Sequence, residues 1–193
     1  MNPNRKLIII QTVSPSYRNK IFYYLKEKFG DNFELFSGDN YFEESVKTDQ
    51  SFIYRKKVIN KFLFHRKLLF QFGVWSQLFK NDLIVLEMNP RIISNWIILI
   101  IRTLINKKTI LWGHAWPRAG RDSKTDRVRN FMRYMGSGII VYTKTQKNEL
   151  QEKMSKKKIY AACNSVYSID EMCVNDRKEE LKNLIYVGRL TEQ

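Results

Sequence analysis

Short apolar runs recur along this 193-residue chain, and most of them lead through a loop into a segment with helical spacing of apolar residues. Such runs are typical of strands buried on both faces of a parallel sheet. We interpret residues 7–13, 33–36, 51–55, 82–86, 109–112, 139–142 and 159–163 as strands. We interpret residues 17–29, 56–79, 96–106, 124–134 and 143–154 as helices. This alternation predicts an α/β domain with a mostly parallel central sheet.

Residues 108–118 carry the clearest candidate site. The apolar run from Thr109 to Trp112 breaks at Gly113 and is followed by His114, Trp116 and Arg118 in a loop. Ligands of open α/β sheets bind just beyond the carboxyl ends of the strands. An imidazole, an indole and a guanidinium at that place form a candidate binding site. The alternative is that His114 is held there by structural hydrogen bonds and that Trp116 covers the sheet edge.

Two other strand ends carry polar loops. The first strand leads into Ser14-Pro15-Ser16, and the run 82–86 leads into Glu87-Met-Asn-Pro-Arg91. The first of these loops contains no Gly-x-Gly-x-x-Gly and no Walker lysine, so a dinucleotide or P-loop site has no support there.

The formal net charge of +15 indicates an anionic partner: phosphate, nucleic acid or an acidic lipid surface. The two cysteines, Cys163 and Cys173, lack metal-ligand spacing, which favours a reduced, cytosolic compartment. The most apolar segment, 96–105, contains Arg102 and is shorter than the ~20 residues of a membrane span. We expect the helix over 96–106, capped by Ser94 or Asn95, to be buried.

Residues 56–79 mix basic residues with large apolar and aromatic ones. That mixture is typical of an interfacial helix on an anionic membrane. It also fits a packed helix with a solvated basic face. Further on, residues 168–182 lack apolar periodicity and resemble a linker, and one more strand begins at Leu184. A parallel strand needs a crossover and neighbours, so we expect the natural polypeptide to continue past Gln193.

Several stretches together resemble the N-terminal half of family 4 glycosyltransferases, the retaining GT-B enzymes of bacterial polysaccharide biosynthesis. They occur in the family's order, and they are Pro15-x-Tyr17-Arg18, Leu86-Glu-Met-Asn-Pro-Arg91, Leu111-Trp-Gly-His114, Ile140-Val-Tyr142-Thr143, Asn164-Ser-Val and Tyr186-Val-Gly188-Arg189-Leu190.

The resemblance implies two Rossmann-like, three-layer domains with an active site in the cleft between them. Residues 1–167 would form the acceptor-binding domain, 168–183 the interdomain linker, and 184–193 the first strand of the donor-binding domain. His114 would be the catalytic histidine, which orients a hydroxyl, and Asn164 a hinge-side residue. The acceptor would be bound by Tyr17, Arg18, Asn89, Trp116 and Arg118, and the donor by Ser14 and Arg189. No metal or cofactor is expected beside the nucleotide-sugar. The family's glycine-rich first loop is replaced here by Ser14-Pro15-Ser16, and its paired-glutamate motif would lie beyond Gln193.

The implied activity is transfer of a sugar from a nucleotide-sugar donor to a lipid-linked saccharide in capsule or O-antigen synthesis. The enzyme would be cytoplasmic and peripheral on the anionic inner membrane face, with no nucleic acid as partner, and this chain alone would be inactive. Two alternatives remain open: a basic nucleic-acid-binding module, and a non-catalytic glycosyltransferase-like subunit that works with a separate donor chain.

Overall fold

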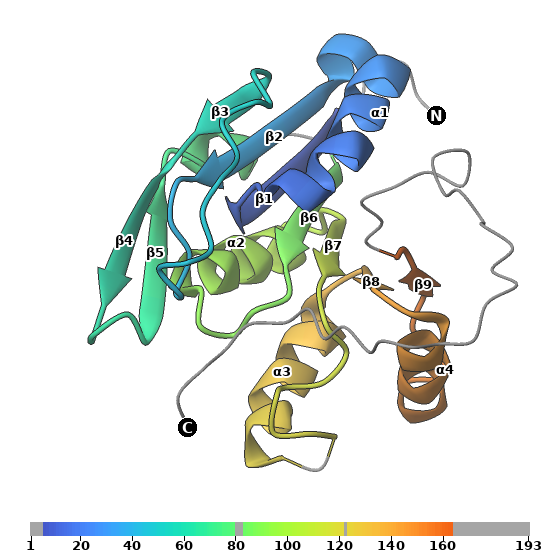
Figure 1. Cartoon of the computed structure of the whole chain (residues 1–193). Coiled ribbons are helices and arrows are strands. Elements are labelled where there is room, and N and C mark those ends of the chain that lie inside the picture. Colours follow the sequence, from blue (N-terminus) through green and yellow to red (C-terminus); the bar gives the residue numbers. More distant parts are fainter. Residues whose placement is uncertain (1–5, 80–82, 122, 164–193) are drawn as a thin grey trace, which may run out of the picture.

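The computed structural model describes residues 6–79, 83–121 and 123–163 (Figure 1). Its centre is a seven-stranded sheet in which every neighbouring pair of strands is parallel. The strands, in their order across the sheet, are β3 (Arg55–Lys57), β2 (Phe33–Gly38), β1 (Leu7–Val13), β6 (Leu83–Glu87), β7 (Thr109–Trp112), β8 (Gly138–Val141) and β9 (Ile159–Ala161). A separate antiparallel hairpin consists of β4 (Ile59–Leu63) and β5 (Leu68–Phe72).

Helices cover both faces of the sheet, which confirms the predicted three-layer, Rossmann-like α/β fold. On one face, α1 (Asn19–Phe29) contributes Phe22 to a core with Ile9, Val85 and Trp112. On the other face lie α2 (Ile93–Leu104), α3 (Lys124–Met135) and α4 (Lys144–Lys153). They pack a larger core against the sheet through Ile98, Leu99, Met132, Leu150 and their neighbours.

The direction in which strands are added reverses between β1 and β6. From β1 the chain moves outward to β2 and β3, and from β6 it moves the other way to β7, β8 and β9. Ligands of doubly wound sheets bind at this switch point, beyond the carboxyl ends of the strands. The loops that follow β1, β6, β7 and β8 therefore meet at the functional edge of the sheet.

The predicted helix over 56–79 is wrong, because residues 59–72 within it form the hairpin β4–β5. Burial alternates along β5: Leu69 and Gln71 are buried, and the residues on either side of them are more exposed. A period of two residues is typical of a strand. Positive φ angles at Phe64, His65 and Arg66 turn the chain back between the two strands. The preceding strand, β3, begins at Arg55 rather than at Ser51. Because residues 56–79 do not form a helix, the hypothesis that this segment is an interfacial helix is also wrong.

The apolar helix α2 differs from its prediction in two ways. It begins at Ile93, and its N-cap residue, Ile92, makes no side-chain cap hydrogen bond. Ser94 and Asn95 are buried inside the helix instead; Ser94 Oγ accepts from the backbone N–H of Gln71. The helix is also not buried all round, because Ile100 and Leu104 are exposed. Among the residues described, no helix is both long and apolar enough to cross a membrane.

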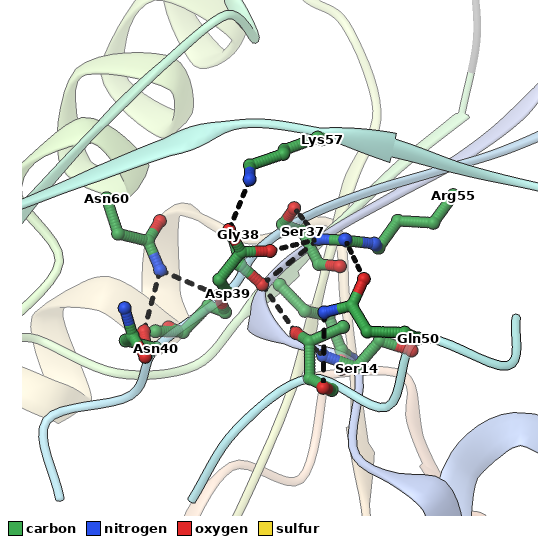
Figure 2. A network of polar contacts seen from close by, with 12 residues as sticks. Ser14, Ser37, Gly38, Asp39, Asn40, Gln50, Arg55, Lys57 and Asn60 are labelled. Carbon is green, nitrogen blue, oxygen red and sulfur yellow. Dashed lines mark hydrogen bonds and ion pairs between the residues drawn. The ribbon is translucent and has the colours of Figure 1, made fainter. Parts of the chain in front are cut away.

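A polar network fixes the loop 39–50 over the edge of the sheet (Figure 2). Asn60, on β4, donates to the backbone carbonyls of Thr12 (2.8 Å) and Asn40 (2.9 Å). Asp39 pairs with Arg55 at 3.0 Å and with Lys57 at 2.5 Å. The hairpin and β3 thereby hold the loop that carries Tyr41 and Glu43 beside the carboxyl ends of β1 and β6.

The predictions for the C-terminal part fall outside the described residues. They comprise the linker 168–183, the strand within 184–193, Asn164 and Arg189.

Candidate functional site

A cleft of about 980 Å³ lies at the carboxyl-end edge of the sheet. Its walls come from the loops after β1, β6 and β7, the start of α3, and the loop 39–50. The side chains that give it its chemistry are Tyr17, Arg18, Tyr41, Glu43, Glu87, Asn89, Arg91, His114, Trp116, Arg118, Arg129 and Tyr142.

The backbone of the loop that carries His114 is held by hydrogen bonds to β8, α3 and α4. Gly113 N–H donates to the carbonyl of Ile140 at 3.0 Å, which joins the loop to β8. Arg129, on α3, donates to the carbonyl of His114 at 2.9 Å. Ala115 N–H donates to Gln146 Oε1, on α4, at 3.1 Å. His114 therefore projects from a fixed backbone into the cleft.

A buried ion pair on α3 supports the same loop. Arg133 and Asp126 are both almost fully buried and pair at 2.6 Å, and Arg133 also donates to the carbonyl of Ala115. Burial alone raises the pKa of Asp126, but the hydrogen bonds and charges of Arg133 and Lys153 outweigh it and hold the pKa below its usual value. Trp116 lies over Arg133, and its indole N–H donates to Glu149 at 2.6 Å. The indole is thus oriented from two helices.

His114 is exposed in the cleft and is kept neutral. Desolvation by the cleft wall, and then the charges of Arg129, Arg18 and Arg118, lower the pKa of the imidazole. The ring packs against Tyr142 with centroids 4.6 Å apart, and it makes no hydrogen bond to any residue that the structure describes. A neutral imidazole with free nitrogens can accept a hydrogen bond from a substrate hydroxyl.

Arg18 is a buried cation without a carboxylate partner among the described residues. Its guanidinium donates to Gln11 and to Tyr142 Oη (2.5 Å), and it lies 5.1 Å from the Trp112 ring centroid. Its Nε has no hydrogen-bond partner within the described part of the chain. Tyr142 is half-buried, and the loss of contact with water raises its pKa to about 12, so the phenol stays protonated. A cation of this kind at a cleft wall favours an anionic ligand.

Glu87 is a cleft carboxylate that the sequence analysis did not select. It is the last residue of β6, and its Oε2 accepts from the backbone N–H of Thr12 at 3.0 Å. Tyr41 Oη lies 3.4 Å from Oε1, and burial together with the charge of Glu87 raises the pKa of Tyr41. The sequence did contain a signal for Glu87, because it is a single acidic residue directly after the apolar run 83–86. Arg129 had no such signal, since only the packing of α3 brings it to the cleft.

The structure brings most of the predicted site residues together. Six of these residues line the same cleft: Tyr17, Arg18, Asn89, His114, Trp116 and Arg118. Ser14 does not line it: its side chain is fully buried, and its backbone bonds to Thr48 and Asp49. Arg189 lies outside the described residues. The functional roles assigned to all these residues remain predictions.

The cleft carries more positive than negative charge. Four arginines (18, 91, 118 and 129) and two glutamates (43 and 87) line it. Glu43 pairs with Arg118, an exposed side chain, so that the loop 39–50 meets the loop after β7. Within the described part of the chain, no group of three or more His, Cys, Asp or Glu side chains is placed to hold a metal ion.

Comparisons with known proteins give little further information. No protein-family model matches the sequence, and no curated protein matches it. Among solved structures, UDP-GlcNAc 2-epimerase from Methanocaldococcus jannaschii is similar with a TM-score of 0.48 and 13% identity, over 84% of this chain and 46% of that one. The present chain thus spans less than half of that enzyme.

Proposed function

We propose that this chain is the acceptor-binding domain of a glycosyltransferase. The enzyme would move a sugar from a nucleotide-sugar to a lipid-linked, phosphorylated saccharide in cell-surface polysaccharide synthesis. The donor site would lie in a second domain, either in a longer form of the polypeptide or in a separate chain. The observation that carries the proposal is the cleft, in which a neutral imidazole, aromatic rings and several guanidinium groups face one space.

Each part of the proposed acceptor has a matching group in the cleft. The rings of Tyr17 and Trp116 offer apolar faces to a sugar ring, with polar atoms beside them for its hydroxyls. Arg18 and Arg129 suit a phosphate or diphosphate, because a guanidinium binds phosphate oxygens through two parallel N–H bonds. His114 would accept a hydrogen bond from the attacking hydroxyl and orient it.

The proposal also follows the resemblance of the sequence to family 4 glycosyltransferases. In that assignment Asn89 and Arg118 contact the acceptor, and Ser14 and Arg189 the donor. The buried position of Ser14 makes its backbone the part that would act, by shaping the loop that carries Arg18.

The test is calorimetric titration with hexose and N-acetylhexosamine diphosphates that carry a short isoprenoid chain. We expect the parent chain to bind at least one of them and His114→Gln to bind it about tenfold more weakly, which is the loss of one or two hydrogen bonds. The matched control is His65→Asn, which changes the exposed histidine of the hairpin turn. It should leave the affinity unchanged, and circular dichroism should show both variants folded.

Two results would contradict the proposal. One is that no saccharide diphosphate binds while single-stranded RNA binds in a salt-sensitive way, which would favour a nucleic-acid-binding module. The other is equal loss of affinity in His65→Asn and His114→Gln, because the ligand would then not occupy the cleft.

A further inference from the structure

Helices α2 and α3 leave a continuous apolar surface exposed on the outside of the domain. On α2, Ile100 and Leu104 lie one helical turn apart, and 42% and 80% of their surfaces are exposed. On α3, Val128, Phe131 and Tyr134 follow one another at helical spacing and are each more than half exposed. We name these five residues the α2–α3 face. Exposed contiguous apolar patches of this kind mark interaction sites.

Two contacts join the helices along this surface. The rings of Trp96 and Phe131 stack with centroids 6.0 Å apart. At the other end, Thr103 Oγ1 donates to the carbonyl of Met135 at 3.5 Å. The two apolar stripes are therefore neighbours, and they form one surface.

The charges on this surface have a single sign. The α2 segment contains no acidic residue, and the one acid of α3, Asp126, is buried in its pair with Arg133. The exposed cations Lys124 and Arg127 lie on the same stripe of α3 as Phe131, seven and four residues before it. An apolar surface whose two helices expose cations and no acidic side chain is complementary to an anionic lipid surface.

We propose that the α2–α3 face docks the protein on an anionic bilayer. A second copy of the chain is a poorer occupant, because it would bring cations of the same sign together in a protein of net charge +15. The α2–α3 face lies next to the cleft, since Thr125, Val128 and Arg129 of α3 line the cleft. Docking through α3 would set the cleft beside the headgroups, where a lipid-linked saccharide presents its diphosphate. This last step rests on the proposed glycosyltransferase function, and the docking itself does not.

Flotation with vesicles that contain no saccharide lipid tests the docking alone. We expect binding to vesicles with about 30% phosphatidylglycerol, weaker binding to pure phosphatidylcholine, and a decrease in high salt. The double variant Leu104→Ser/Phe131→Asn should lower the partition coefficient about tenfold or more, because two side chains no longer enter the interface. Lys124→Glu/Arg127→Glu should lower binding to the anionic vesicles only.

The hairpin supplies a matched control. Ile59 and Phe64 are 67% and 71% exposed, and Ile59→Ser/Phe64→Asn removes the same kinds of side chain and introduces the same residues. This control should float like the parent, and circular dichroism should show every variant folded. The proposal is overturned if the parent does not bind anionic vesicles, or if the hairpin variant loses binding and the helix variant keeps it. It is also overturned if the parent is a dimer that Leu104→Ser/Phe131→Asn converts to a monomer.

A second measurement separates this proposal from the glycosyltransferase assignment. The same sugar diphosphate with a methyl group in place of the isoprenoid chain should bind Leu104→Ser/Phe131→Asn as well as it binds the parent. If the parent binds vesicles but no sugar diphosphate, the docking stands and the proposed function fails. If it binds the sugar diphosphate but no vesicles, the proposed function stands and the docking fails.

Discussion

The buried pair of Asp126 and Arg133 allows a sharp test of what holds the His114 loop. Both carboxylate oxygens of Asp126 are engaged: Oδ1 accepts from Arg133 at 2.6 Å, and Oδ2 accepts from Lys153 at 2.8 Å. In Asp126→Asn the amide NH₂ would face a cation in either orientation, and the guanidinium would stay buried without its counter-charge. Breaking a buried pair from one side costs about 3–5 kcal/mol.

We expect the lower end of that range, about 3 kcal/mol, because Arg133 keeps its bond to the Ala115 carbonyl and its contact with Trp116. For a domain of this size the loss corresponds to a fall in Tm of about 6–12 °C, measured by calorimetry or circular dichroism. The matched control is Asp31→Asn, the same chemical change at an exposed pair with Lys26, and it should melt with the parent. Equal Tm values for the two variants would refute the claim that the pair holds the loop.

The ion pair also predicts that the effect of Asp126→Asn on the free energy of unfolding depends on pH. The folded state holds the pKa of Asp126 below its usual value of 3.8, so the pair stabilises the protein fully above that pH. The contribution is lost as the pH falls through the lowered pKa, because the folded state then takes up the proton. The difference in unfolding free energy between parent and Asp126→Asn should therefore narrow below pH 3.8. If the difference in unfolding free energy between parent and variant stays constant through the acid range, the charge of Asp126 is not the cause of that difference.

Two further predictions concern the cleft and its edge. The lowered pKa of His114 predicts an NMR titration with a midpoint below 6.5, and the signal is assigned by its absence in His114→Gln. Because the unfolded chain binds that proton more tightly, stability should fall as the pH drops below 6.5, and a midpoint above that value would contradict the electrostatics of the cleft. At the edge, a Cβ on Gly38 would overlap the side-chain amide of Asn60, so Gly38→Ala should destabilise by about 1–3 kcal/mol in urea unfolding. Asn60→Ala should relieve part of that cost, and additive effects of the two changes would contradict the overlap.

The strands of the site could be predicted from the sequence because their signal is local. The predicted runs at β1 and β7 match the structure, and those at β6 and β8 differ by one residue. Polar residues directly after parallel strands must meet at one edge, and Asn89 and His114 do. Knowing the order of the strands was not necessary for that inference.

The hairpin could not be predicted with the same reasoning. Its sequence places residues such as Lys61 and Lys67 beside Phe62 and Leu68, a mixture that fits a helical face as well as a strand. The deciding features are tertiary: the buried side-chain amide of Gln71 donates to the Gln11 carbonyl and to Asn60 Oδ1. Arg129 and the pair on α3 were missed for the same reason, since each depends on how α3 packs on the loop after β7.

Helix α3 explains why docking should be separable by mutation from stability and ligand binding. Its inner side carries Met132, the ion pair and the cleft residues Thr125 and Arg129, and its outer side carries Phe131 and Tyr134. The outer residues lie opposite the inner ones on a helix with 3.6 residues per turn, so a substitution on the outer side leaves the ion pair and the cleft residues in place. The inner side nevertheless fixes the helix to the loop of His114. Loosening the pair should therefore weaken ligand binding and docking together, whereas changes to the outer side should affect docking alone.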